Sequence, residues 1–141
     1  MPMHRPTPWA LAAAVALCAP LHAGAACGDE LDARHRQQIV GPNHTIVFTP
    51  GVAGIAVDRH FGLDIVVCPH AGAGEPVALR VDALMPAHRH GMNYRPTMQR
   101  LAPGRYRAEG LMFHMAGNWR LSFDLSADGH LMHLSKDLEV R

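Results

Sequence analysis

The stretch Trp119-Arg-Leu-Ser-Phe-Asp-Leu125 alternates large apolar residues with polar ones at every position. Successive side chains of a β-strand point to opposite faces, so this pattern places the four apolar residues on one face and the three polar residues on the other. A helix would spread the same residues around its circumference. The segment therefore predicts a strand that is buried on one side and faces water on the other.

The same two-residue period recurs along the chain, with no sustained helical period. It predicts further strands over residues 45–49, 61–68, 77–83, 105–113 and 132–140. Within the fourth of these the apolar parity changes at Gly110, which predicts a β-bulge. Turn signals rich in Gly and Pro separate the runs. This spacing predicts an all-β fold, an immunoglobulin-like β-sandwich of about seven strands.

Residues 1–26 have the composition of a secretory signal peptide. The segment has a basic start at Arg5, an apolar core over residues 10–21 and small residues at its end. The core is shorter than the ~20 residues that a membrane helix needs. Cleavage after Ala25 or Ala26 fits a signal-peptidase site. We therefore expect a periplasmic product with no stable membrane insertion after processing.

Cleavage would leave an N-terminal arm, residues 27–43, and one domain, residues 44–141. A lipoprotein anchored at Cys27 is the less favoured alternative, because Gly24 stands where a large aliphatic residue is usual. The signal segment holds one of the 13 basic residues and none of the 12 acidic ones, so the mature chain is formally neutral. Nucleic acids and anionic membranes bind proteins with a basic excess, so neither is expected as a partner.

Two cysteines, Cys27 and Cys68, remain after processing, and an oxidising compartment favours a disulfide between them. Such a bond would close a loop of about 40 residues and stabilise the fold by at most roughly 4 kcal/mol. The alternative is a thiolate metal ligand at Cys68, assisted by the nearby His70.

Histidine and methionine cluster in two segments, Met85-Pro-Ala-His-Arg-His-Gly-Met92 and His114-Met115. Both segments lie at the ends of predicted strands, so a sandwich could bring them to one rim. Thioether is a soft ligand that favours Cu(I), and imidazole accepts both copper oxidation states. The absence of acids from the first segment disfavours Ca²⁺ and Mg²⁺. The predicted cofactor is copper, Cu(I) or Cu(II), and the candidate ligands are His88, His90, Met92, His114, Met115 and Met85.

Each of these side chains also has a structural interpretation. Methionine in a β-sandwich is most often a packing residue, and Met85, Met112 and Met132 fit that role. An isolated histidine is most often a surface residue or a satisfied polar group, which we expect of His35, His44, His60 and His70. His130 and His133 are closer together, but an alternating strand places them on opposite faces. In the segment His88-Arg-His90, an extended backbone would point both imidazoles to the same side, as a chelating pair requires.

Three segments carry a family resemblance: residues 85–92, residues 104–115 (Gly-Arg-Tyr-Arg-Ala-Glu-Gly-Leu-Met-Phe-His-Met) and residues 117–124 (Gly-Asn-Trp-Arg-Leu-Ser-Phe-Asp). They resemble the YtkA-like family, which is related in pattern to FixH-like proteins, and the likeness spans about residues 55–126. The resemblance implies a small exported or membrane-tethered immunoglobulin-like domain with a copper-related role. By match to the family blocks, the implied ligands are His88, His90, Met92, His114 and Met115. Many members have Pro where this chain has Ala116, and the cysteine pair is not part of the family pattern.

The leading hypothesis is a periplasmic copper-binding protein that carries, delivers or buffers copper, with an envelope copper-handling protein as its partner. The alternative is a non-metal interaction module of the cell envelope that uses the same rim. No catalytic triad, nucleophile elbow, phosphate loop or carboxylate pair stands out, so no enzymatic activity is expected.

Overall fold

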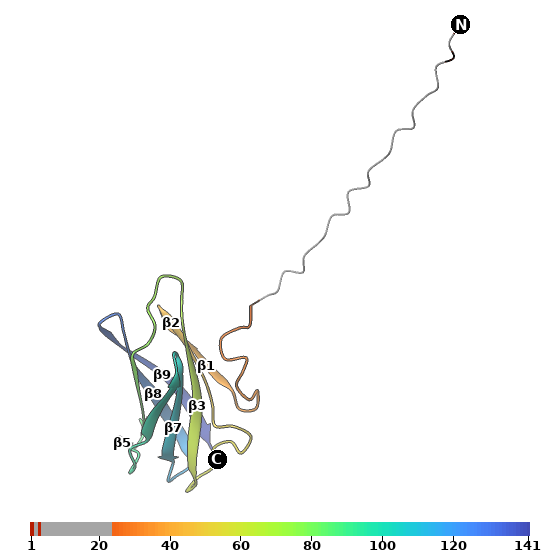
Figure 1. The fold of residues 1–141 in the computed structure, drawn as a ribbon. Helices are drawn as coiled ribbons and strands as arrows, with labels where there is room; N and C mark the ends of the chain where they lie inside the picture. Colours follow the sequence, from red (N-terminus) through yellow and green to blue (C-terminus); the bar gives the residue numbers. More distant parts are fainter. Residues whose placement is uncertain (2, 4–23) are drawn as a thin grey trace.

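The computed structural model describes residues 1, 3 and 24–141, and these residues form two antiparallel sheets without any helix (Figure 1). In spatial order, the first sheet contains β1 (Gln37–Val40), β2 (His44–Thr49), β3 (His60–Pro69), β7 (Arg105–Met112) and β6 (Thr97–Ala102). The second contains β5 (His90–Gly91), β4 (Ala78–Met85), β8 (Gly117–Ala127) and β9 (His130–Val140). The predicted all-β, immunoglobulin-like sandwich is confirmed.

The core lies between the sheets and is built by the alternation seen in the sequence. On β8 every second residue from Trp119 to Leu125 is fully buried, and on β3 the same holds from Leu63 to Val67. The intervening residues of β8, among them Arg120 and Asp124, face outward. Period-two alternation thus placed the core residues of β3 and β8 correctly, whereas Val77, expected on the inward face before β4, is exposed.

The predicted bulge at Gly110 is present. Across the β3–β7 ladder, Phe61 pairs with Leu111 and Leu63 pairs with Ala108, so β7 carries one residue more than β3 between these pairs. Gly110 has a φ of 86°, a left-handed conformation that glycine adopts without steric cost. The extra residue lets both Ala108 and Leu111 point into the core.

The sheets hold nine strands, more than the roughly seven expected from spacing. The additional strands are β1, β5 and β6. β5 is only two residues long, and β6 is mostly exposed, so neither has a clear apolar period. β1 lies within residues 27–43, for which the sequence predicts an N-terminal arm. It pairs with β2, so the domain begins before residue 44.

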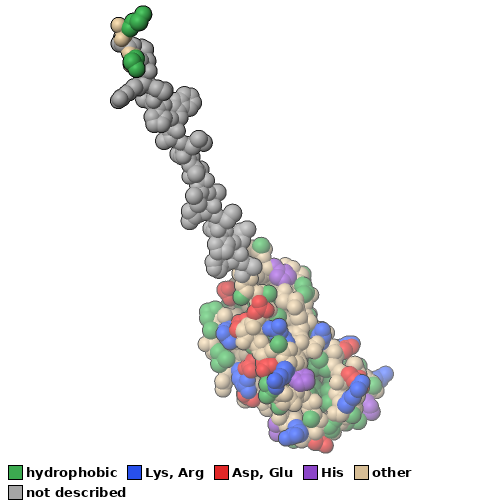
Figure 2. Space-filling model, turned by 90° about the vertical axis from the view of Figure 1, so that its right-hand side faces the viewer, with side chains coloured by type: hydrophobic (Ala, Val, Ile, Leu, Met, Phe, Trp, Pro, Cys, Tyr) green, Lys and Arg blue, Asp and Glu red, His purple; other side chains and the backbone are tan. Residues whose placement is uncertain are grey.

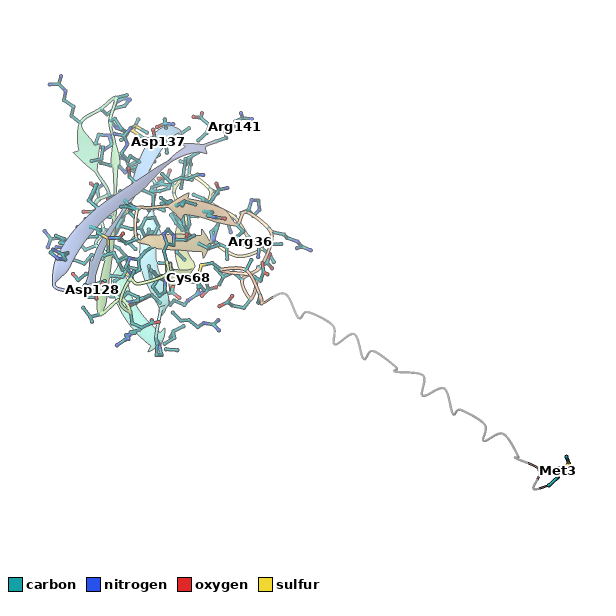
Figure 3. The ribbon with its side chains drawn as sticks, turned by 90° about the horizontal axis from the view of Figure 1, so that it is seen from above. Met3, Arg36, Cys68, Asp128, Asp137 and Arg141 are labelled. Carbon is teal, nitrogen blue, oxygen red and sulfur yellow. A yellow bond between two sulfur atoms is a disulfide. The ribbon has the colours of Figure 1, made fainter. Side chains whose placement is uncertain are left out.

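The remainder of the arm covers the outer face of the first sheet. Cys27 is bonded to Cys68, with the two Cα atoms 6.0 Å apart, and Leu31 packs on Val47 and Val66 in a small second cluster. Figure 3, in which Cys68 is labelled, shows the arm beside this part of the sheet. The predicted disulfide is present, and it fastens the arm where the outward residues of β2 and β3 are apolar.

Two further findings bear on the N-terminus and the surface. Residues 2 and 4–23, which make up most of the predicted signal peptide 1–26, lie outside the described residues. Across the described part of the chain there is no helix of the length and apolarity needed to cross a bilayer.

Figure 2 shows one face of the domain, on which acidic and basic side chains are interspersed.

Candidate metal centre

The two His/Met segments meet at one end of the sandwich. β4 ends at Met85 and β8 begins at Gly117, and these two strands are paired, with Leu84 opposite Arg120. The loop 86–89, which leads to β5, and the loop 113–116, which leads from β7 to β8, therefore lie at the same rim (Figure 1). Strand order brings together segments that are distant in sequence.

Three imidazole rings form a row at this rim. The ring centroids of His90 and His114 are 5.0 Å apart, and those of His88 and His90 are 5.6 Å apart. His90 and His114 are half-buried, whereas His88 is exposed. His90 thus lies between the half-buried ring of His114 and the exposed ring of His88.

The backbone around His88 differs from the sequence-based expectation. Residues 86–89 form a turn in which the His88 amide donates to the carbonyl of Met85 (3.1 Å), and Arg89 has a φ of 54°. His88 and His90 therefore do not lie on one extended strand. The prediction that an extended backbone points both imidazoles to the same side is wrong. Their rings are neighbours because the turn folds back.

Hydrogen bonding leaves ring nitrogens free for a ligand. Nδ1 of His90 donates to the carbonyl of Gly91 (3.2 Å), which leaves the lone pair of Nε2 available. Nδ1 of His114 is buried and has no hydrogen-bond partner among the described residues. An unpartnered buried polar atom costs about 1–3 kcal/mol, and bonding to a metal would remove that cost.

An aromatic wall supports the imidazole pair. The ring of Trp119 lies 5.7 Å from that of His90 and 5.4 Å from that of His114, and it stacks on Phe113 at 4.6 Å. Its Nε1 donates to the carbonyl of Met115 (3.0 Å), so the indole also fixes the β7–β8 loop. Sequence reasoning assigned Trp119 to the core and missed its position at the site. The sequence feature that indicates this position is that Trp119 is the first inward-facing residue after the loop that carries His114.

The three candidate methionines belong to the main core or pack against it. Met85 is 1% exposed and belongs to the main core, while Met92 and Met115 are half-buried and pack against it. The Met85 methyl group lies 3.1 Å from where a Cβ on Gly117 would stand, so this side chain reaches the β7–β8 loop. Met85 is therefore a packing residue, and the end of its side chain lies near the first residue of β8.

Arg120, the residue after Trp119, is paired with an acidic residue of β9. Arg120 binds Asp137 through two hydrogen bonds of 2.7 and 3.1 Å across β8 and β9, and these bonds hold the pKa of Asp137 below its usual value. Within residues 24–141, no three His, Cys, Asp or Glu side chains are arranged to hold a metal ion. The site thus offers two close imidazoles and neutral sulfur donors.

The alternative metal site at Cys68 is wrong, because Cys68 is in the disulfide. His70 is also engaged at both ring nitrogens, with the Thr45 hydroxyl at 2.9 Å and the Pro42 carbonyl at 3.2 Å. These contacts join the loops at the opposite end of the sandwich and make His70 a structural residue.

A groove of about 480 Å³ opens beside His90, and His114 does not line it. His90 and Met92 line it together with Arg89, Tyr94 and Arg95. A partner could therefore reach His90 and Met92 from this groove.

Comparison with known proteins supports the fold. The structure is similar to that of a DUF4426 family protein from Pseudomonas aeruginosa PAO1, with a TM-score of 0.53 and 10% sequence identity, over 77% of this chain and 97% of that one. No protein-family model and no curated protein matches the sequence. At this identity the similarity establishes a common β fold.

Proposed function

We propose that this chain is a periplasmic copper-binding protein that carries, delivers or buffers copper through His90 and His114. The observation that carries the proposal is the approach of the two rings to 5.0 Å, together with the buried, unpartnered Nδ1 of His114. An imidazole pair held in this way by the fold needs little rearrangement to bind an ion.

The donor chemistry favours copper over harder metals. Imidazole binds both Cu(I) and Cu(II), and thioether sulfur favours Cu(I). Met85, Met92 and Met115 belong to the same two segments and would supply this soft donor type, with the exposed His88 as a third imidazole or an entry ligand. The resemblance to the YtkA-like family at the same segments supports the copper-related role, and the signal-like composition of residues 1–26 supports the periplasmic location.

Access to the site suits transfer of the metal. The groove beside His90 and Met92 is open to solvent, so a copper-handling protein of the envelope can approach one side of the bound ion. Exposed His88 at the mouth of the site can be exchanged for a ligand of the partner. Stepwise exchange of ligands avoids release of free copper.

Metal titration of the mature, untagged protein tests the proposal. We expect one Cu(I) per chain, bound in competition with a chelator, and loss of this binding when His90 and His114 are both replaced by Ala. The matched control replaces His130 and His133, two exposed histidines of β9 at the opposite end of the sandwich, by Ala. Circular dichroism checks that both double variants keep the fold.

Two outcomes would contradict the proposal. Stoichiometric copper binding retained by the His90/His114 variant would place the ligands elsewhere. Weak binding lost equally in both double variants would show a general effect of surface histidines. The second result would favour the alternative, an envelope interaction module in which the same rim contacts a protein without metal.

A further inference from the structure

Trp119, His90 and His114 surround a common point. Their ring centroids form a triangle with sides of 5.0, 5.4 and 5.7 Å. The circumradius of this triangle places one point at about 3.1 Å from all three centroids, and an imidazole–metal bond of about 2.0–2.1 Å places an ion at about this distance from the ring centroid. An ion bonded to both histidines at this point would also contact the indole.

The indole cannot easily move away from this position. Phe113 stacks on it with ring planes 15° apart, which covers one face, and the bond from Nε1 to the Met115 carbonyl fixes its edge. Trp119 has no exposed surface, so water does not compete for its ring. A cation within about 6 Å of a tryptophan centroid is attracted by the ring, most strongly where water is excluded.

We propose that Trp119 contacts the bound ion directly and makes the site selective for Cu(I) over divalent ions. This inference rests on the proposed function and adds a residue and an oxidation state to it. The aromatic ring is a neutral, polarisable neighbour that offers no σ-donor lone pair. It occupies a position in which Cu(II) or Zn(II) would need a further nitrogen or oxygen ligand, whereas Cu(I) is satisfied by few soft donors.

Tryptophan fluorescence tests this directly, because the chain has two tryptophans and Trp9 lies in the predicted signal peptide. In the mature protein all tryptophan emission then comes from Trp119. Titration with Ag(I), a redox-inactive monovalent analogue of Cu(I), is expected to quench this emission with an end point at one ion per chain. Zn(II) at the same concentration is expected to leave the emission unchanged.

Replacement of Trp119 by Phe measures the selectivity. A smaller ring fits the cavity and keeps the histidines, but it is a weaker cation partner. The expected result is a loss of about 10- to 30-fold in Cu(I) affinity with Cu(II) affinity unchanged. Equal loss for both ions, or no loss for either, would overturn the proposal.

The outcomes separate this inference from the proposed function. If the wild-type protein binds no Cu(I), the proposed function fails. If it binds Cu(I) through His90 and His114 and the Trp119 emission is unaffected by Ag(I), only the role of Trp119 fails. The quenching measurement uses the wild-type chain, so it decides the question even where the Trp119 variant does not fold.

Discussion

His114 holds its imidazole 5.0 Å from that of His90, although the two residues lie at the ends of different strands, β7 and β5. β4, which pairs with β5, also pairs with β8, and the loop before β8 carries His114. The contact is thus made through two strand pairings. It brings β5 and the loop 113–116 together at one rim and defines the site that the following predictions address.

His88 is predicted to govern release of copper and to contribute little to its affinity. The residue is exposed, and its ring lies 5.6 Å from His90 at the outer end of the row. Replacement by Ala should change Cu(I) affinity less than about 3-fold, or below 1 kcal/mol. Stopped-flow transfer of Cu(I) to a chelator should slow by a larger factor. A large loss of affinity with unchanged transfer would instead make His88 a core ligand.

Met85 combines packing with proximity to the site, and a substitution can separate the two roles. Replacement by Leu conserves volume and should change the free energy of unfolding by less than about 1.5 kcal/mol. If the sulfur is a ligand, Cu(I) affinity should fall about tenfold, because Leu offers no donor. The matched control is Met132→Leu on β9, which lies in the strand half distant from the rim. Equal affinity of the Met85 variant and the wild type would assign Met85 to packing alone.

Tyr106 is predicted to make the fold sensitive to alkaline pH. Its side chain is buried and donates a hydrogen bond to the Pro76 carbonyl (3.1 Å), and burial is the main cause of its raised pKa. The unfolded state releases the proton near the ordinary pKa of 10.0 and the folded state does so only at higher pH. The contribution of the neutral phenol to stability is therefore present below pH 10 and is lost as pH rises through the folded pKa.

Urea unfolding at several pH values between 8 and about 11 measures this contribution. The Tyr106→Phe variant should be less stable than the wild type by about 1 kcal/mol at pH 8, because it lacks the hydrogen bond. Its stability should fall less steeply above pH 10. Parallel pH profiles of the two proteins would exclude Tyr106 as the cause.

Gly104 and Gly129 offer a matched test of backbone crowding. Both have left-handed φ values, 68° and 73°. A Cβ on Gly104 would lie 2.6 Å from the Val67 carbonyl oxygen, whereas a Cβ on Gly129 would meet nothing within 4 Å. Gly129→Ala should therefore cost only about 1–2 kcal/mol of backbone strain, and Gly104→Ala should cost about 1–3 kcal/mol more because the backbone must shift. Thermal or urea unfolding of the two variants checks the order, and equal losses would refute the crowding argument.

Much of the fold could be predicted from local pattern. Burial follows the alternation of apolar residues along β3, β4 and β8, and a change of parity located the bulge at Gly110. The strands that escaped prediction lie at sheet edges or are very short. The apolar residues of β1 do not alternate with polar ones, because Gln37 and Gln38 are followed by Ile39 and Val40, and β6 is mostly exposed. Hydrophobicity therefore carries no two-residue period in either strand, and only pairing with a neighbour defines them.

The candidate site divides in the same way. The sequence by itself determined the chemistry, since the spacing of His88, His90, Met92 and His114 shows which donors are available. Only the tertiary structure decided which donors approach one another and that Trp119 contacts the rings of His90 and His114. It also decided that residues 86–89 form a turn. The physical reason is that residue type is a local property, whereas the distance between two loops depends on strand pairing and on core packing between sheets.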